Sequence, residues 1–274
     1  MSDTSKESLI QDQILEVSLE GTKKILFQME NCICKIYSNN GSTGTGFFCR
    51  IKIQYILFPL LITSYNVLNE NDIENNKIID LIINNKALKI TLDKRRLKYT
   101  NKELGVTFIE IKIKKDEIYE NNFMEIEEND LDKEKNMEYK RKSIYILHYP
   151  KGKLNVSYGI INDLLNEKTI NHYCKIEEGS SSSPILSIET FKIIGMHNFS
   201  SNKYTKLNFG TFIKCIINDF INNVNKHEIF TNLKYNSGKN REETISEDIG
   251  KHLSDFEIMQ VLGEGYFGFV AKVK

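Results

Sequence analysis

The sequence predicts an all-β fold flanked by an N-terminal and a C-terminal helix. From Asn31 onward, apolar residues recur with a period of two in short runs rich in Ile, Val, Tyr and Phe. Turn sequences such as NNGS, YTNK and YPKGK separate these runs, and few helical stretches lie between them. This pattern favours an antiparallel sandwich or barrel over a parallel α/β sheet. The expected strands are CICKIY, GTGFFCRIKI, PLLIT, KIIDLII, ALKITL, GVTFIEIKI, SIYILHY, LNVSYGII, HYCKI, PILSI and FKIIGM.

Helical periodicity appears on either side of this β region. Residues 8–28 space their apolar side chains as an amphipathic helix does, with Gly21 expected to end its first part. The segment TFIKCIINDFINNV, residues 211–224, predicts a closing helix that packs on the β domain. The expected organisation is a helix in residues 1–29, a β domain in 30–224, a polar linker in 225–254 and a separate strand-forming segment in 255–274.

Composition limits the possible partners and the cellular compartment. Lys plus Arg number 37 and Asp plus Glu number 37, so the chain lacks the positive charge that non-specific binding to nucleic acid or to an acidic membrane requires. The polar start MSDTSKESLIQDQ does not resemble a secretory signal, and no apolar run reaches the roughly 18 residues of a membrane span. A cytoplasmic protein is expected. The five cysteines lack C-x-x-C spacing and are expected to be reduced and buried, with no metal site: Cys32, Cys34, Cys49, Cys174 and Cys215.

The segment EEGSSSSPILS is the strongest candidate for a reactive site. Gly, small polar residues and Pro before a strand are typical of a nucleophile turn, here Gly179 to Pro184. Such a turn can direct the backbone N–H groups of Gly179 and Ser181 at one point, where they would stabilise an oxyanion beside the Ser181 hydroxyl. A plain serine-rich loop is the alternative.

Other segments resemble a trypsin-like (chymotrypsin-fold) serine protease. STGTGFFCRI, PLLITSYNVL, ELGVTFIEI, IYILHYPKG and IIGMHNF occur in the order of that family's motifs, over about residues 30–224. The Y-P-x-G turn at residues 149–152 is similar to that of single-chain members rather than the disulfide-rich digestive enzymes. The resemblance implies two packed antiparallel β-barrels with a peptide-binding cleft.

The resemblance also implies that the catalytic triad is degenerate. Asn66 stands at the position of the histidine base, and Gly105 stands at the position of the aspartate; a shift of two residues would place Glu103 there instead. Ser181 remains as the nucleophile, with Gly179 in the oxyanion hole, while Ser182 replaces a glycine and is expected to crowd the acyl site.

The expected function is therefore an inactive protease domain that binds a peptide or partner protein. A weakly active serine endopeptidase with an unconventional base is an alternative. His197 resembles a residue of the substrate cleft, and neither it nor His148 is expected to face Ser181. The histidines of the chain are His148, His172, His197, His227 and His252.

The last residues carry a second motif, LGEGYFGFVAKV. Gly263, Gly265, Gly268 and Val270 fit G-x-G-x-x-G-x-V and resemble the glycine-rich loop of a Ser/Thr protein kinase. The strand pattern of FGFVAKVK disfavours a dinucleotide-binding fold, in which a helix starts within the motif. We expect no cofactor in this chain, and ATP with Mg²⁺ only if a kinase domain continues beyond Lys274. A fragment of such a kinase is the other alternative function.

Overall fold

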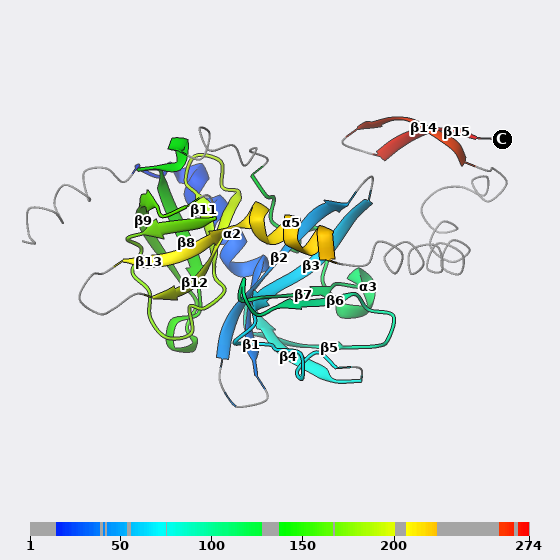
Figure 1. Ribbon diagram of the computed structural model, residues 1–274, viewed down its shortest axis with the longest axis horizontal. Helices are drawn as coiled ribbons and strands as arrows, with labels where there is room; N and C mark the ends of the chain where they lie inside the picture. Colours follow the sequence, from blue (N-terminus) through cyan, green and yellow to red (C-terminus); the bar gives the residue numbers. More distant parts are fainter. Residues whose placement is uncertain are drawn as a thin grey trace, which may run out of the picture. The chain divides into compact units, whose positions relative to one another are not determined.

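The computed structural model describes most of the chain, and the chain divides into two compact units at Asn223 and Val224. The first unit holds two β-sheets and their helices, and the second holds a β-hairpin (Figure 1). The described residues are 15–38, 41, 43–53, 56–74, 76–127, 137–166, 168–200, 207–223, 258–265 and 268–273.

The first sheet of the first unit is open and has seven strands, in the order β5-β4-β1-β2-β3-β7-β6. Its alternating sequences place one face in the core: in β4, Ile79, Leu81 and Ile83 are buried, whereas Ile78 and Asp80 are exposed. The strands are β1 (Ile33–Tyr37), β2 (Thr43–Ile53), β3 (Ile56–Ser64), β4 (Ile78–Ile83), β5 (Lys86–Thr91), β6 (Lys98–Asn101) and β7 (Val106–Glu110).

The second sheet closes into a six-stranded barrel, in the order β10-β13-β12-β11-β8-β9. Its interior is filled by buried aliphatic side chains such as Ile146, Ile170 and Ile185. The strands are β8 (Ser143–His148), β9 (Asn155–Leu164), β10 (Thr169–His172), β11 (Pro184–Ser187), β12 (Ile193–Ser200) and β13 (Asn208–Phe212).

Two helices connect the sheets. Helix α2 (Leu19–Asn31) precedes the first sheet but is bonded to the second: the Gln28 side chain donates to the Phe191 carbonyl at 2.9 Å and accepts from the Tyr145 hydroxyl at 2.6 Å. Helix α5 (Ile213–Asn223) follows the second barrel, and its Phe220 ring stacks on Phe108 of β7 with centroids 4.6 Å apart. Each helix therefore fastens one sheet to the other.

Short helical segments complete the first unit: α3 (Ile113–Asp116) and the 3-10 turns η1 (Glu120–Asn122), η2 (Met137–Tyr139) and η3 (Pro150–Gly152). Within the described residues, no helix combines the length and the apolar character needed to cross a membrane.

The predicted fold class is confirmed, although the first of the two predicted barrels is an open sheet and several elements differ in detail. The first three residues of the predicted turn YTNK, residues 99–101, belong to β6, and residues 173–176 of the predicted strand HYCKI lie after β10. Phe212, assigned to the closing helix, belongs to β13. Within the described residues, the helix predicted over residues 8–28 begins only at Leu19, because Ser18 is its N-cap and accepts from the Gly21 N–H, and residues 15–18 are not helical. Gly21 therefore lies in the first turn of α2 and does not end a helix; a Cβ atom on it would lie 2.7 Å from the Phe191 ring. The predicted helical turns before residue 15 and the linker lie outside the described residues.

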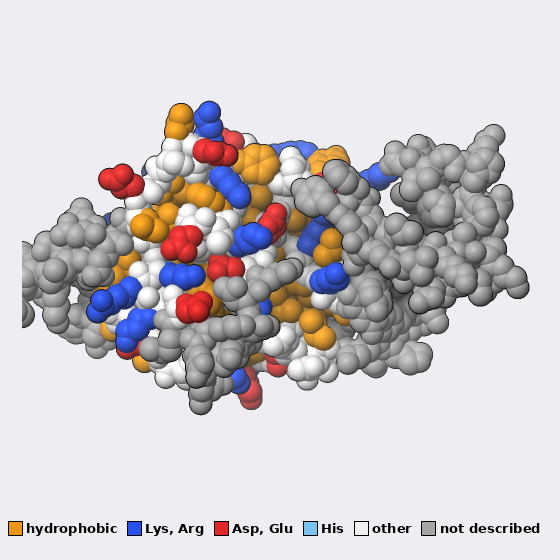
Figure 2. Space-filling model, turned by 90° about the horizontal axis from the view of Figure 1, so that it is seen from above, with side chains coloured by type: hydrophobic (Ala, Val, Ile, Leu, Met, Phe, Trp, Pro, Cys, Tyr) orange, Lys and Arg blue, Asp and Glu red, His pale blue; other side chains and the backbone are white. Residues whose placement is uncertain are grey.

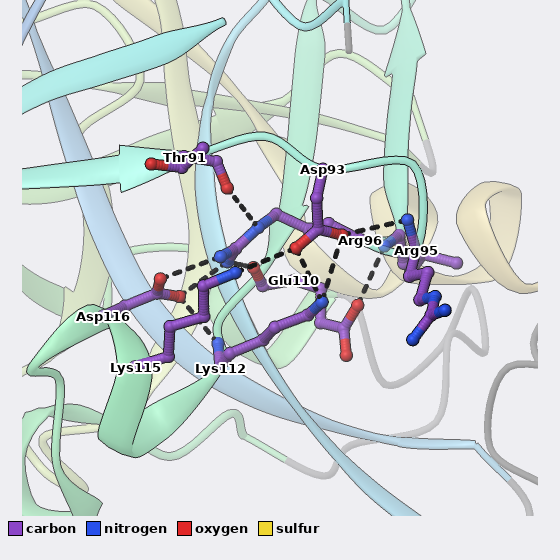
Figure 3. A network of polar contacts seen from close by, with 9 residues as sticks. Thr91, Asp93, Arg95, Arg96, Glu110, Lys112, Lys115 and Asp116 are labelled. Atoms are coloured by element: carbon purple, nitrogen blue, oxygen red, sulfur yellow. Dashed lines mark hydrogen bonds and ion pairs between the residues drawn. The ribbon is translucent and has the colours of Figure 1, made fainter. Parts of the chain in front are cut away.

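A buried ion pair holds the region between β5 and α3 (Figure 3). Arg96 binds both carboxylate oxygens of Asp116, at 2.6 and 2.8 Å, and both side chains are almost wholly buried. The same guanidinium donates to the carbonyls of Thr91 and Glu110, and the Lys112 N–H donates to Asp116. Because the charges are matched and their remaining hydrogen-bonding capacity is used, the pair can stay buried.

The second unit contains the antiparallel hairpin of β14 (Ile258–Gly265) and β15 (Gly268–Val273). Its register places Gly265 opposite Gly268 and Gly263 opposite Val270. The predicted glycine motif therefore lies at the end of a hairpin.

Replacing Arg96 by Met should lower the free energy of unfolding by about 3–5 kcal/mol, because it leaves the Asp116 carboxylate buried without a counter-charge. Chemical denaturation measures this loss. Lys86→Met is the matched control, since it removes an exposed ion pair with Glu117 and should leave the unfolding curve nearly unchanged. Equal losses for the two variants would contradict the interpretation.

Candidate functional site

The site is built around Thr45, a residue of β2 that bonds to the serine-rich turn of the second barrel. The Thr45 hydroxyl donates to the Gly179 carbonyl at 3.0 Å and accepts from the Tyr149 N–H at 3.1 Å. The Thr45 N–H donates to the Ser181 carbonyl at 3.3 Å. One fully buried residue of the first sheet thus fixes two carbonyls of the turn, one through its side chain and one through its backbone.

Gly179 adopts a conformation that only glycine takes without strain. Its φ is +90°, and a Cβ atom on it would lie 2.5 Å from the Tyr149 carbonyl oxygen. The turn at residues 149–152 supports it from this side, because the Lys151 N–H donates to the Glu178 carbonyl at 2.8 Å. The predicted Y-P-x-G turn is therefore part of the site.

The backbone N–H groups of the turn differ in whether they have an acceptor. Those of Ser180, Ser182 and Ser183 donate to the carbonyls of Glu177, His197 and Ser180, respectively. Those of Gly179 and Ser181 donate to no atom in the described part of the chain. The two N–H groups assigned to an oxyanion hole are thus the two left without a protein acceptor.

Ser181 is half-buried, and its hydroxyl faces another hydroxyl. Its Oγ atom donates to Oγ of Ser64, the last residue of β3, at 3.1 Å. Asn66 follows in the next turn with its side chain exposed, and it makes no hydrogen bond to Ser181. The position assigned to the histidine therefore supplies no group that bonds Ser181.

Gly105 lies directly before β7, with a φ of +66°. Its carbonyl accepts from the N–H of Tyr65, the neighbour of Asn66, at 3.0 Å. A Cβ atom on Gly105 would meet no atom within 4 Å, so no side chain fills the space. Glu103, the alternative aspartate position, is exposed and lines a hollow of about 380 Å³ that also includes Asp219 of α5.

The expected crowding by Ser182 is wrong, because its side chain points into the protein. Ser182 is fully buried, and its Oγ atom donates to the Thr45 carbonyl at 2.7 Å and lies 3.2 Å from the Thr63 hydroxyl. Its φ of +68° is the left-handed conformation that a glycine would normally occupy. Hydrogen bonds to the first sheet offset the cost of that conformation.

The histidines of the second barrel are buried and bonded to groups other than Ser181. His148 lies between the hydroxyls of Ser180 and Ser157, at 2.7 and 2.9 Å, and burial lowers its pKa to about 4. His172 and His197 bond each other at 3.3 Å, and burial lowers the pKa of His197 to about 3. All three are neutral near pH 7. His227 and His252 lie outside the described residues.

Other chemistry is sparse in the described ranges. No group of three or more His, Cys, Asp or Glu side chains among them could hold a metal ion. All five cysteines are free thiols, and burial raises the pKa of Cys32 to about 12 and also that of Cys34, Cys49 and Cys174. The four buried thiols, those of Cys32, Cys34, Cys49 and Cys174, are therefore protonated and unreactive near pH 7.

Solved structures share this arrangement of sheets. A serine endoprotease from Yersinia pestis matches with a TM-score of 0.56 at 12% identity, over 76% of this chain and 69% of that one. The chain has the trypsin-like fold. A protease from M. tuberculosis matches in its active form with a TM-score of 0.53 (11% identity, 75% of this chain, 86% of that one). Its inactive form gives 0.51 (13% identity, 75% and 95%).

At the level of sequence, neither a protein-family model nor a curated protein matches the chain. Within the trypsin-like fold, sequence reasoning missed Thr45 and Ser64 as parts of the site. Both lie in segments that carry the resemblance, STGTGFF and LITSYN. Their roles depend on partners more than 110 residues away, Thr45 on Gly179 at a separation of 134 and Ser64 on Ser181 at 117.

Thr45→Val should destabilise the first unit by about 1–3 kcal/mol, because it keeps the shape of the side chain but leaves the Tyr149 N–H without its acceptor. The measurement is the free energy of unfolding in denaturant. Thr91→Val, at an exposed position of β5, is the control and should change stability by less than about 0.5 kcal/mol. If both variants unfold at the same denaturant concentration, Thr45 does not hold the turn.

Proposed function

We propose that residues 30–224 form a trypsin-like domain that binds a peptide or partner protein without cleaving it. The observation that carries the proposal is the environment of Ser181. Its hydroxyl donates to the neutral hydroxyl of Ser64, and no His, Asp or Glu among the described residues bonds to it. A serine becomes a nucleophile when a base within hydrogen-bond reach takes its proton.

The residues at the two replaced positions lack the chemical groups that serine-protease catalysis requires. The Asn66 amide cannot accept a proton and return it to a leaving group. Gly105 offers no carboxylate to orient an imidazole. Losses of this kind reduce turnover by roughly 10⁴-fold to 10⁶-fold in serine proteases.

The binding function is supported by what the site retains. Extended peptides bind proteins largely through main-chain hydrogen bonds. The turn keeps the N–H groups of Gly179 and Ser181 without an acceptor in the described ranges, and Thr45 fixes their neighbours. A weakly active endopeptidase would need a base that this environment does not supply.

The proposal also covers location and partners. The protein is cytoplasmic under this proposal and binds no nucleic acid, membrane or metal ion. The free thiols agree with a reducing compartment. Lys plus Arg equal Asp plus Glu at 37 each. On the face seen in Figure 2, basic and acidic side chains are interspersed among apolar ones, and nucleic-acid binding requires a surface of one sign.

Labelling with a fluorophosphonate probe tests the inactivity. Wild-type protein should react no faster than Ser181→Ala, and neither should hydrolyse a pool of fluorogenic peptides, because the Ser181 proton has no acceptor base. Labelling of the wild type that disappears in Ser181→Ala, with peptide cleavage, would overturn the proposal in favour of the endopeptidase.

A restored triad is the positive control for that assay. Asn66→His combined with Gly105→Asp should give measurable hydrolysis, since the space beside Gly105 is open and aspartate tolerates a positive φ. Asn66→His combined with Glu103→Asp is the matched control and should stay inactive. The opposite result would assign the aspartate position to residue 103.

We propose a second candidate function for the C-terminal unit. In this proposal the hairpin is the start of an ATP-dependent Ser/Thr kinase domain. The hairpin register favours it, because the glycines of the motif lie on two antiparallel strands and a dinucleotide-binding motif runs into a helix. Sequencing the transcript past codon 274 should reveal a strand with a lysine and an H-R-D segment. An immediate stop codon would remove this candidate.

A further inference from the structure

We propose that the turn at Gly179–Ser183 binds the free C-terminal carboxylate of a peptide. The inference rests on the proposed function and names the ligand class for the same site. It begins from the two backbone donors without an acceptor, Gly179 N–H and Ser181 N–H. These residues are half-buried, whereas the residues whose N–H groups are satisfied, Ser180, Ser182 and Ser183, are fully buried.

The donors are held in place before any ligand arrives. Gly179 is fixed through its carbonyl by Thr45 Oγ1 and through its left-handed backbone against Tyr149. Ser181 is fixed through its carbonyl by the Thr45 N–H. Pre-organised donors bind an anion without the entropic cost of ordering a loop.

Local charge also favours an anion. Lys35 of β1 extends over the turn at residues 149–152, with Nζ 3.1 Å from the place of a Cβ atom on Gly152. It makes no ion pair with a described residue, and its amino group lies over the Tyr37 ring. Lys151 and Lys175 both form ion pairs with Glu177. Together with Lys35 they carry three positive charges, against two negative charges on Glu177 and Glu178, so the net charge of this group is +1.

A carboxylate uses these donors better than a peptide carbonyl does. Hydrogen bonds to an ionised acceptor are roughly twice as strong as those to a neutral one. In an active protease, a pair of such donors serves a negative charge that lasts only through the reaction. Here no base starts the reaction, so no transient oxyanion forms. A ligand with a permanent negative charge can instead keep both charge-assisted hydrogen bonds for as long as it is bound. A main-chain carboxylate fits because one donor is the N–H of Ser181 itself and the other lies two residues before it, at Gly179, where the main chain of a bound peptide would pass.

The test uses hexapeptides prepared in pairs that differ only in a free or an amidated C-terminus. Wild-type protein should bind the free acids at least about tenfold more tightly by fluorescence anisotropy. The amide ¹⁵N–¹H signals of Gly179 and Ser181 should shift with the free acids and not with the amides. Ser181→Ala should keep the preference, because it keeps the N–H group.

Charge variants provide the matched comparison. Lys35→Gln should weaken binding of the free acids by roughly threefold at low salt, and Lys94→Gln, exposed in the turn after β5, should not change it. Equal affinity within each peptide pair would overturn the carboxylate proposal and leave peptide binding intact. If neither peptide of a pair binds, the carboxylate proposal is also overturned. Cleavage of the peptides, detected by mass spectrometry, would instead overturn the proposed function.

Discussion

The geometry of the site depends on the hydrogen bonds that join Thr45 of the first sheet to the serine-rich turn of the second barrel. Thr45 contributes its N–H, its carbonyl and its hydroxyl to this junction. These groups hold Gly179, Ser181 and Ser182 in place, and none of the bonds involves the positions of a catalytic base or aspartate. The shape of the turn therefore does not depend on Asn66 or Gly105.

Ser182 shows how the turn tolerates a change that its backbone disfavours. A left-handed conformation costs a non-glycine residue about 1–2 kcal/mol. A serine at φ +68° regains that energy through hydrogen bonds of its buried hydroxyl to Thr45 and Thr63, each worth about 1 kcal/mol. The side chain that seemed to block the site thus adds another bond between the two sheets.

Much of the fold can be predicted from the sequence, because apolar and polar residues alternate along a strand that has one buried face. β4 is an example, with IIDLII alternating between exposed and buried. β6 was missed because its four residues are all half-buried and carry no alternation. At β10, the buried Asn171 and His172 are polar, so hydrophobicity placed the strand too late in the chain.

The residues of the candidate site could be found from motif order, but their contacts could not. Sequence alone left two registers for the aspartate position, Gly105 and Glu103. Beyond the paired residues of β3 and β7, the N–H of Tyr65, the neighbour of Asn66, donates to the Gly105 carbonyl, while Glu103 is exposed and lines a hollow with Asp219 of α5. Such pairing is a long-range property, and local patterns do not encode it.

The hydrogen bonds of the turn separate two functions that active proteases combine. Catalysis requires a base that responds to the substrate, whereas recognition requires donors that are rigid and unsatisfied. Under the proposed function, Asn66 and Gly105 leave the first requirement unmet, and the N–H groups of Gly179 and Ser181 meet the second. These two N–H groups donate to no atom in the described part of the chain, so a bound acceptor adds a hydrogen bond to each. Under the same proposal, donors that are held in place without turnover serve a ligand that remains bound.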